Sequence, residues 1–362
     1  MEHKSVLVAM SGGVDSSVTA LRLRQMGLDC HGVTMRLFSD KDTDILPNLQ
    51  RSCARPEEAD DARRIADLLG MPFEALDCAA DFRRHVIDYF IRTYEEGGTP
   101  NPCVECNRTM KFGKLLQMAD TLGCDGIATG HYAQLRKSGG GRTELLRATD
   151  ASKDQTYVLW QLTQEQLSRA RFPLGSLTKT EVRAIAEANG FCTAQKKESQ
   201  DICFIPDGDY VGFIERTTKK SYPTGQFLDL DGNVLGTHNG CIRYTVGQRK
   251  GLGIAFGKPT YVCAKCVADN TVTLGSNEDL FRRDLTAHGV NLIAVDRIDA
   301  PLRVLAKIRY QASPAPAWAE QTDEGRLALR FDEAQRAITS GQSVVLYDAE
   351  SGNSVIGGGV ID

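Results

Sequence analysis

The chain has 362 residues, of which 41% are hydrophobic and 25% charged, and its formal net charge is −4. This composition is typical of an ordinary globular chain of two or three domains and argues against a generic polyanion-binding protein. No apolar run approaches the ~20 residues that span a bilayer, so we expect no membrane segment. Eleven cysteines, scattered through a chain with no secretion leader, favour reduced thiols and a cytoplasmic location over a disulfide scaffold.

The N-terminal part alternates strand and helix patterns. An apolar run at residues 6–10 predicts a strand, and a Gly-rich turn at 11–16 leads into a predicted helix over 18–26. The further predicted elements are strands at 30–37, 73–76 and 126–129 and helices at 56–70, 81–94 and 111–122. Such alternation predicts an α/β domain with a parallel sheet covered on both faces and ligands at the C-terminal ends of its strands.

The pattern changes near residue 207, where glycine and turn residues become frequent and strands dominate. The stretch 240–257 and a predicted hairpin over 261–274 indicate a small β-rich module. Alternation with period two at 303–310, 326–331 and 343–347 predicts the strands of a small barrel. We therefore expect three domains, at 1–206, 207–275 and 276–362.

The turn Ser11-Gly12-Gly13-Val14-Asp15-Ser16 carries the first chemical signal. A strand, a Gly-rich turn and a helix N-terminus together direct free backbone N–H groups at one point, which favours a phosphate site. The turn lacks the lysine of G-x-x-x-x-G-K-[ST] and the G-x-G-x-x-G pattern. An ordinary turn capped by Ser or Asp is the alternative interpretation. S-G-G-x-D-S after a first strand resembles the pyrophosphate loop of the N-type ATP pyrophosphatases, which adenylate a carbonyl oxygen.

The stretch 99–107, T-P-N-P-C-V-E-C-N, carries the second signal. Its two prolines predict a rigid, non-helical loop ahead of a helix that begins near Lys111. A cysteine on such a loop, close to a helix N-terminus and to Arg108 and Lys111, is expected to have a lowered pKa and to favour the nucleophilic thiolate. A further cysteine, Cys203, lies in an apolar segment at the end of the α/β domain.

Six motifs together give a closer resemblance: T-P-N-P-x-x-x-C-N, A-T-G-H-Y, K-D-Q-T-Y, I-C-F-I, Y-T-V-G-Q-R-K-G-L-G and S-G-Q-S-V-V-L-Y. In this order they resemble the tRNA-specific 2-thiouridylases of the MnmA family along nearly the whole chain. The resemblance implies a pyrophosphatase domain, a small central domain and a C-terminal β-barrel. It also implies a reaction in which ATP adenylates C2 of a wobble uridine and sulfur then replaces the C2 oxygen.

The resemblance assigns roles to individual residues. Cys106 matches the catalytic nucleophile, Cys203 the persulfide carrier, and Asp15 is suited to hold Mg²⁺ or position the phosphates. The positions matching the ATP site are Ala9, Met10, Ser11, Gly12, Gly13, Val14, Asp15, Ser16, Met35 and Gly130. Those matching contacts with the target base are Asn101, Pro102 and Cys103. Those matching tRNA contacts are His131, Lys153, Asp154, Gln155, Arg309, Tyr310 and Gln342. The implied partners are tRNA and a sulfur donor such as a cysteine desulfurase or a sulfur-relay protein.

The sequence departs from the common family pattern at Cys103, where many relatives have Asp. Cys103 and Cys106 form C-x-x-C, and Cys203 offers a third thiolate. Three cysteines around a [4Fe–4S] cluster with one open iron are therefore an alternative to the persulfide route. A zinc site built from Cys103 and Cys106 with Cys263 and Cys266 is a weaker alternative, because the second pair falls on a predicted strand in another domain.

Two other functions stay open at this point. A small-molecule synthetase of the argininosuccinate or guanylate type would use the same phosphate loop but has no need of the cysteine loop. A non-catalytic RNA-binding relative would not need Asp15, Cys106 and Cys203 together. Basic residues of the central module, Arg243, Arg249, Lys250 and Lys258, are candidates for phosphate contacts or for an ordinary solvated surface.

Overall fold

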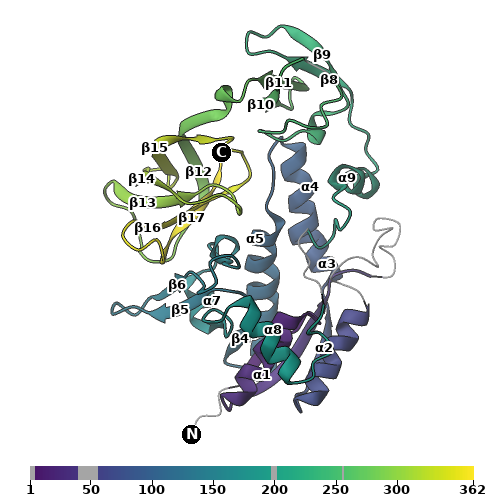
Figure 1. The fold of residues 1–362 in the computed structure, drawn as a ribbon, viewed down its shortest axis with the longest axis vertical. Helices are drawn as coiled ribbons and strands as arrows, with labels where there is room; N and C mark the ends of the chain where they lie inside the picture. The colour runs from purple at the N-terminus through teal and green to yellow at the C-terminus, as the bar shows by residue number, and fades with distance from the viewer. Residues whose placement is uncertain (1–4, 40–55, 197–201, 255–256) are drawn as a thin grey trace. The chain divides into compact units, whose positions relative to one another are not determined.

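The computed structural model describes residues 5–39, 56–196, 202–254 and 257–362. The chain falls into two compact units. Unit 1 comprises residues 1–87, 102–210 and 353–355, and unit 2 comprises 88–101, 211–352 and 356–362. Figure 1 shows the helices and strands of each unit. Among the residues described, no helix has the length and apolar character needed to cross a membrane.

Unit 1 is built on a five-stranded sheet of order β3-β2-β1-β4-β7, in which every pairing is parallel. Its strands are β1 (Ser5–Ala9), β2 (Asp29–Arg36), β3 (Phe73–Asp77), β4 (Gly126–Ala128) and β7 (Ala170–Arg171). Val6, Leu7 and Val8 are all fully buried, as expected for a central strand covered on both faces. The predicted parallel α/β domain is therefore confirmed.

Helices of unit 1 follow the strands and cover the sheet. They are α1 (Val14–Gln25), α2 (Pro56–Leu68), α3 (Ala79–Phe82), η3 (Arg83–Ile87), α5 (Pro102–Cys106), η4 (Asn107–Lys114), α6 (Leu115–Thr121), η5 (Thr156–Val158), α7 (Gln164–Arg169) and α8 (Lys179–Ala188). A small antiparallel pair, β5 (Gln134–Lys137) and β6 (Thr143–Leu146), stands beside them. α2 confirms the helix predicted over 56–70, and its Ala62, Ile65 and Ala66 are buried.

The helix after the cysteine stretch begins earlier than predicted. The sequence predicted a non-helical loop over 99–107, whereas helical structure runs without a break from Pro102 to Thr121 through α5, η4 and α6. The prediction was wrong because proline breaks a helix interior but is favoured at its first position, where the missing N–H has no intrahelical partner. Cys103 and Cys106 therefore lie three residues apart in the first turns of a helix and on one face of it.

The first part of unit 2 combines two helices with a small sheet. The helices are α4 (Asp88–Glu95) and α9 (Tyr210–Thr218), whose Phe90 and Phe213 rings meet edge to face. The sheet has the order β10-β11-β8-β9. Its strands are β8 (Gly225–Leu228), β9 (Val234–His238), β10 (Tyr261–Cys266) and β11 (Thr271–Gly275), with a short helical turn at η6 (Cys241–Arg243). The antiparallel pairing of β10 with β11 confirms the predicted hairpin.

The C-terminal part of unit 2 is a closed barrel of order β12-β15-β14-β13-β16-β17, preceded by η7 (Glu278–Leu280). The strands are β12 (Phe281–Leu292), β13 (Leu302–Lys307), β14 (Ala315–Gln321), β15 (Leu327–Arg336), β16 (Ser343–Asp348) and β17 (Val355–Ile361). Along β14, the buried Ala317 and Ala319 alternate with the exposed Trp318, so one face fills the barrel. The predicted barrel is confirmed.

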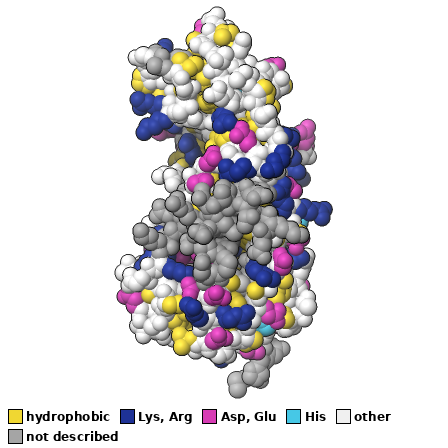
Figure 2. All heavy atoms as spheres, turned by 90° about the vertical axis from the view of Figure 1, so that its right-hand side faces the viewer, with side chains coloured by type: hydrophobic (Ala, Val, Ile, Leu, Met, Phe, Trp, Pro, Cys, Tyr) yellow, Lys and Arg dark blue, Asp and Glu magenta, His cyan; other side chains and the backbone are white. Residues whose placement is uncertain are grey.

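The surface carries no large field of one sign on the face drawn in Figure 2, where basic and acidic side chains are interspersed. In the central module, the candidate phosphate contact Arg243 pairs instead with Glu215 at 2.6 Å within unit 2. Arg249, Lys250 and Lys258 are exposed.

Candidate functional site

The Gly-rich turn of unit 1 lies between β1 and α1, at the C-terminal edge of the parallel sheet. Gly13 is the N-cap of α1 and supplies no side-chain cap. The hydroxyls of Ser16 and Ser17 both donate to the Gly13 carbonyl at 3.0 Å, and the Ser11 N–H donates to Ser16 Oγ at 3.2 Å. The serines thus fix the shape of the turn, and the uncapped start of α1 has the geometry of an anion site.

Two glycines of this region allow a close approach of backbone. Gly12 has a φ of +69°, and a Cβ added there would lie 2.1 Å from the carbonyl oxygen of Glu58 in α2. A Cβ on Gly130 would lie 3.0 Å from Asp15 Cβ and 3.1 Å from the Ser16 N–H nitrogen. Glycine is therefore needed at Gly12 both for its φ and for the contact, and at Gly130 so that the strand end can pack on the start of α1.

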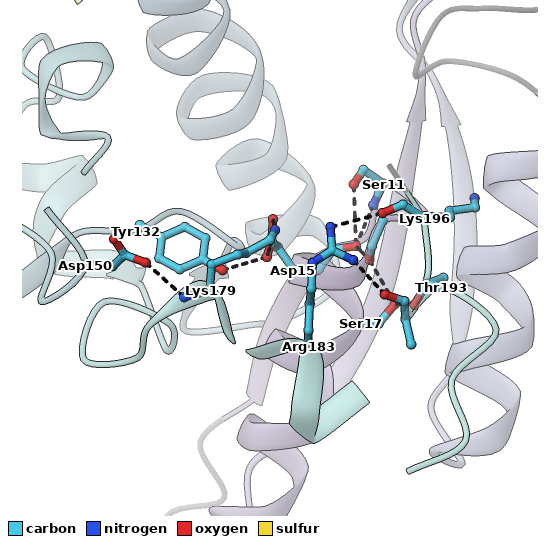
Figure 3. A network of polar contacts seen from close by, with 12 residues as sticks. Ser11, Asp15, Ser17, Tyr132, Asp150, Lys179, Arg183, Thr193 and Lys196 are labelled. Atoms are coloured by element: carbon cyan, nitrogen blue, oxygen red, sulfur yellow. Dashed lines mark hydrogen bonds and ion pairs between the residues drawn. The ribbon is translucent and has the colours of Figure 1, made fainter. Parts of the chain in front are cut away.

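Asp15 is the acidic side chain of the turn, and a lysine from a distant part of the chain holds it. Lys179, the first residue of α8, places Nζ 2.7 and 2.8 Å from the two carboxylate oxygens of Asp15. The hydroxyl of Tyr132 donates to Asp15 Oδ1 at 2.8 Å, and the Lys179 ammonium lies 5.7 Å from the Tyr132 ring centroid. Figure 3 shows this network around the turn.

A carboxylate at this position fits a magnesium site. Mg²⁺ is commonly held by one or two protein carboxylates together with substrate phosphates, and Asp15 remains about one-third exposed at the end of the turn. Across the described ranges, no three or more His, Cys, Asp or Glu side chains are gathered so that they could hold a metal ion. Asp15 is therefore suited to a metal ion only when other ligands, such as the phosphates of a bound nucleotide, complete the site.

The segment after α8 braces the turn from the other side. Lys196 donates to the Gly12 carbonyl at 3.0 Å and forms an ion pair with Asp61 of α2 at 2.6 Å. Thr193 donates to Ser17 Oγ at 3.1 Å, and Arg183 of α8 donates to the carbonyls of Ala194 and Lys196. Residues of α8 and of the segment 191–196 thus lie beside the turn (Figure 3), and Lys196 links the turn to Asp61 of α2.

The predicted nucleophile lies on the helix that begins at Pro102. Cys106 is half-buried and Cys103 is exposed. Of the two cations that the sequence predicted beside this cysteine, Arg108 pairs with Glu105 at 2.6 Å and Lys111 contacts His131. Asn107 is buried and donates to the Val158 carbonyl at 2.9 Å, which fixes this helix against η5.

Cys203 belongs to the same unit as Cys106, and the residue next to it packs on α3. The ring of the adjacent Phe204 packs edge to face on Phe82 of α3, with centroids 5.8 Å apart. Cys78, the N-cap of α3, is buried. Burial raises the pKa of the Cys78 thiol to about 11, and Cys106 is one of the neighbours whose charge adds to the shift. The Cys203 segment thus packs on α3, and α5, which carries Cys106, packs against η3, the helical segment that follows α3.

His131 lies inside unit 1 with only 6% of its surface exposed. Thr129 Oγ1 lies 2.6 Å from Nδ1, and the Lys111 ammonium lies 3.4 Å from Nε2. An ammonium can only donate, so Nε2 accepts and Nδ1 carries the proton toward Thr129. Burial holds the pKa of His131 well below its usual value, and the charge of Lys111 lowers it further. In this conformation His131 positions neighbouring groups and has little surface to offer an RNA.

The K-D-Q segment also has internal roles. Asp154 is buried and accepts from the Ala148 N–H and from the Thr156 hydroxyl, and Arg147 pairs with it at 3.3 Å. Gln155 Oε1 accepts from the Tyr132 N–H at 2.9 Å. This segment therefore supports the tyrosine that contacts Asp15. Lys153 is half-exposed, and Met35 is half-buried at the end of β2.

Unit 2 holds the remaining predicted site residues. Gln342 Nε2 donates to the carbonyls of Thr99 at 2.9 Å and Pro100 at 3.3 Å, directly before the half-buried Asn101. Arg309 donates to the Arg336 carbonyl. Tyr310 is 41% exposed, and the Lys307 ammonium lies 5.5 Å from its ring centroid. Gln342 therefore supports the backbone of the T-P-N-P segment, and Tyr310 offers an exposed aromatic face.

Sequence reasoning missed the two lysines at the turn. Lys179 lies in T-K-T-E, where Thr178 and Glu181 form a capping box, and a lysine at the first position of a helix opposes the helix dipole. In the sequence, this unfavourable place for a lysine was the one feature that could have marked Lys179 as a candidate site residue. Lys196 carried no signal, because only the folded chain brings it to Gly12.

Comparisons with known proteins agree along the whole chain. Three family models match: the tRNA methyl transferase HUP domain at residues 4–207, the tRNA methyl transferase PRC-barrel domain at 211–276, and the aminomethyltransferase β-barrel domain at 282–361. A tRNA-specific 2-thiouridylase MnmA of Clostridioides difficile is 48% identical over 99% of this chain and 98% of its own length. The tRNA-specific 2-thiouridylase MnmA of Acetivibrio thermocellus is 46% identical over 100% of this chain and 100% of its own length. That of Clostridium perfringens is 45% identical over 100% of this chain and 99% of its own length. On this identity and coverage, the chain belongs to the tRNA-specific 2-thiouridylase MnmA family.

Proposed function

We propose that this enzyme makes 2-thiouridine at the wobble position, 34, of tRNA, using ATP to activate C2 and a cysteine persulfide as the sulfur donor. One observation carries the proposal: a phosphate turn, a cysteine pair at a helix start and Cys203 occur together in one compact unit. We expect the chain to work as three domains, 1–206, 207–275 and 276–362, in the cytoplasm.

The first step is adenylation. The C2 oxygen of the uracil attacks the α-phosphorus of ATP, the bond from that phosphorus to the bridging oxygen breaks, and its electron pair leaves with pyrophosphate. The uncapped start of α1 and the backbone of residues 9–16 are suited to hold the phosphates. Bound Mg²⁺ supplies charge neutralisation at the phosphates, and Asp15 is the residue that would hold it.

The second step is sulfur transfer. The terminal sulfur of a Cys203 persulfide attacks C2, and AMP leaves with the former C2 oxygen. The Cys106 thiolate then attacks Cys203 Sγ, which breaks the persulfide S–S bond, leaves sulfur on the base and forms a Cys106–Cys203 disulfide. In a second order of events, Cys106 first releases hydrosulfide, which then attacks C2. Either order consumes the persulfide, and an external thiol reductant and a sulfur-donor protein restore the enzyme.

The site supports these roles through its local structure. Cys203 precedes Phe204, which packs on Phe82 of α3, and Cys106 lies in α5, which packs against the adjoining η3. Cys106 also follows the T-P-N-P segment, which we propose binds the target base through Asn101, Pro102 and Cys103. We further propose tRNA contacts at Lys153, Arg309 and Tyr310. For His131, Asp154, Gln155 and Gln342 the internal hydrogen bonds favour a supporting role in the same reaction.

The test is a single-turnover reaction of persulfide-loaded enzyme with a tRNA transcript that carries U34, with a C34 transcript as the matched control. We expect AMP, pyrophosphate and 2-thiouridine in equal amounts with U34 and none of them with C34. AMP formation that does not depend on tRNA would favour a small-molecule synthetase. RNA binding without ATP turnover would favour a non-catalytic relative.

The cluster route is distinguished by iron. Cys103 and Cys106 share a helix face, but with Cys203 they do not form a gathered ligand set in the structure described. Iron and acid-labile sulfide are measured on anoxically purified enzyme beside Cys103→Ala, with thiolation assayed on the same samples. Full activity without iron supports the persulfide route. Loss of cluster and activity together in Cys103→Ala would establish the three cysteines as cluster ligands.

A further inference from the structure

The phosphate turn has no lysine of its own, yet two lysines from later in the chain reach it. The Lys196 ammonium donates a hydrogen bond to the Gly12 carbonyl and pairs with Asp61, and both contacts hold the turn against the rest of the domain. The Lys179 ammonium donates to both carboxylate oxygens of Asp15. Asp15 lies at the end of the turn, on the side that is suited to a metal or a phosphate. The two lysines therefore differ in what they contact, and Lys179 is the one directed at the ligand side of the turn.

The position of Lys179 is costly for a residue with a structural role alone. Only 9% of its surface is exposed, and it is the first residue of α8, where a positive charge opposes the helix dipole. Its backbone is fixed there, because its N–H donates to Asp150 Oδ2 at 3.0 Å and the Thr178–Glu181 capping box closes the same turn. In the structure the Asp15 carboxylate compensates this buried charge, and an anion bound at the adjoining phosphate turn would also compensate it.

Asp15 on its own would repel a nucleotide. Its carboxylate lies in the first turn of α1, at the point where the free N–H groups of that helix attract phosphate. Lys179 neutralises this carboxylate, and its flexible four-carbon stem allows the ammonium to turn from Asp15 to a phosphate without backbone movement. The ring of Tyr132 lies alongside and keeps Asp15 in place through its hydroxyl.

We propose that Lys179 is the phosphate-binding lysine of this site: it pairs with Asp15 in the structure described and contacts the β- and γ-phosphates when ATP is bound. This inference rests on the proposed adenylation step. In that step the bond between the α-phosphorus and the bridging oxygen breaks, and the electron pair leaves with pyrophosphate. An ammonium at the leaving group stabilises that charge, so Lys179 acts both in binding and in the departure of pyrophosphate.

The test compares ligands that differ in their phosphates. Titration calorimetry measures the binding of Mg²⁺–ATP, Mg²⁺–pyrophosphate and AMP to wild-type enzyme, Lys179→Met, Lys179→Arg and Lys137→Met. The last is a matched control that removes an exposed lysine of the same unit from β5. We expect Lys179→Met to bind ATP and pyrophosphate at least about 10-fold more weakly, as for a lost charge-assisted hydrogen bond, with AMP within about 2-fold of wild type. Lys179→Arg should recover most of the loss.

A double-mutant cycle with Asp15→Asn separates direct contact from support of Asp15. If Lys179 contacts phosphate, Lys179→Met weakens pyrophosphate binding in the Asp15→Asn background as well. If it only orients Asp15, Lys179→Met has no further effect in that background, and the proposal is overturned. The double variant also leaves no unpaired charge, so it carries the test if Lys179→Met alone does not fold.

Two more outcomes are decisive. Equal loss of AMP and pyrophosphate binding in Lys179→Met would indicate general damage to the site and would overturn the assignment. A wild-type enzyme that binds no ATP in the presence or absence of tRNA would contradict the proposed function itself. In that case the failure lies with the adenylation step and not with the role of Lys179.

Discussion

Gly12→Ala should destabilise unit 1 far more than the same change at another glycine of similar conformation. A Cβ at Gly12 would lie 2.1 Å from the Glu58 carbonyl oxygen, whereas Cβ contacts below 3.0 Å essentially never occur, so the turn and α2 must separate by about 0.9 Å. Gly27 is the matched control, because its φ is +78° against +69° at Gly12 and nothing lies within 4 Å of its added Cβ. Both alanines must adopt a left-handed φ, and only the alanine at position 12 would also clash with α2.

The magnitudes follow from these two terms. The left-handed conformation costs an alanine about 1 kcal/mol, and forced overpacking typically adds about 1–3 kcal/mol. We expect a loss in the free energy of unfolding of about 1 kcal/mol for Gly27→Ala and about 2–4 kcal/mol for Gly12→Ala. We also expect Gly12→Ala to lose Mg²⁺–ATP affinity, because the phosphate turn itself is displaced.

Urea unfolding followed by tryptophan fluorescence gives the measurement. The chain has two tryptophans, of which Trp160 is buried in unit 1 and Trp318 is exposed in unit 2. In a Trp318→Phe background the signal reports unit 1 alone, and a difference of ~2 kcal/mol shifts the urea midpoint by about 0.7–2 M at common m-values. Equal midpoints for Gly12→Ala and Gly27→Ala would refute the close approach of the turn and α2.

Three further changes test the site. Below pH ~6.5 His131 is protonated in the unfolded chain but not in the folded chain, because burial holds the pKa of the folded-state histidine low. The free energy of unfolding should therefore fall with decreasing pH, by up to about 1.4 kcal/mol per pH unit. His131→Asn should flatten this dependence, measured by urea unfolding at a series of pH values. Lys196→Met removes the contacts with Gly12 and Asp61 and should cost about 1–2 kcal/mol, measured as a lowered melting temperature by calorimetry. Gln342→Glu places a carboxylate against two carbonyls and should lower the stability of unit 2 by more than Gln342→Ala does, measured by urea unfolding followed through Trp318 in a Trp160→Phe background.

Each of these has a contradicting result. An unchanged pH dependence in His131→Asn would show that this histidine titrates normally. An unchanged melting temperature in Lys196→Met would show that its contacts add nothing to the turn. For the third change, the control is Gln226→Glu, which alters an exposed glutamine of β8. Equal effects at the two glutamines would contradict the role of Gln342 in holding the backbone before Asn101.

The sequence predicted the parallel sheet, the hairpin and the barrel, because each depends on local periodicity. Val6, Leu7 and Val8 form one continuous apolar run, and the alternation along β14 has period two. The start of the cysteine helix was mispredicted because a proline is read as a breaker unless its place at the first helical position is known. The spacing of apolar residues does not distinguish a proline that starts a helix from one that breaks it.

The contacts around the phosphate turn could not be predicted. Asp15 and Lys179 are 164 residues apart, and Gly12 and Lys196 are 184 apart, so only the folded chain joins them. The same holds for Gln342 and Thr99, which are 243 residues apart. The motifs indicated which residues matter, whereas the partners of these residues depend on the tertiary structure. His131 and Asp154 illustrate this difference, since both belong to motifs and both are buried.

The central claim is that Cys203 carries the sulfur and Cys106 releases it. The most direct measurement is mass spectrometry of the digested enzyme after a single turnover of persulfide-loaded protein with U34 tRNA. The account predicts one Cys106–Cys203 disulfide formed, and one Cys203 persulfide lost, for each 2-thiouridine. Formation of 2-thiouridine with both cysteines unchanged, and with iron and sulfide required, would contradict it.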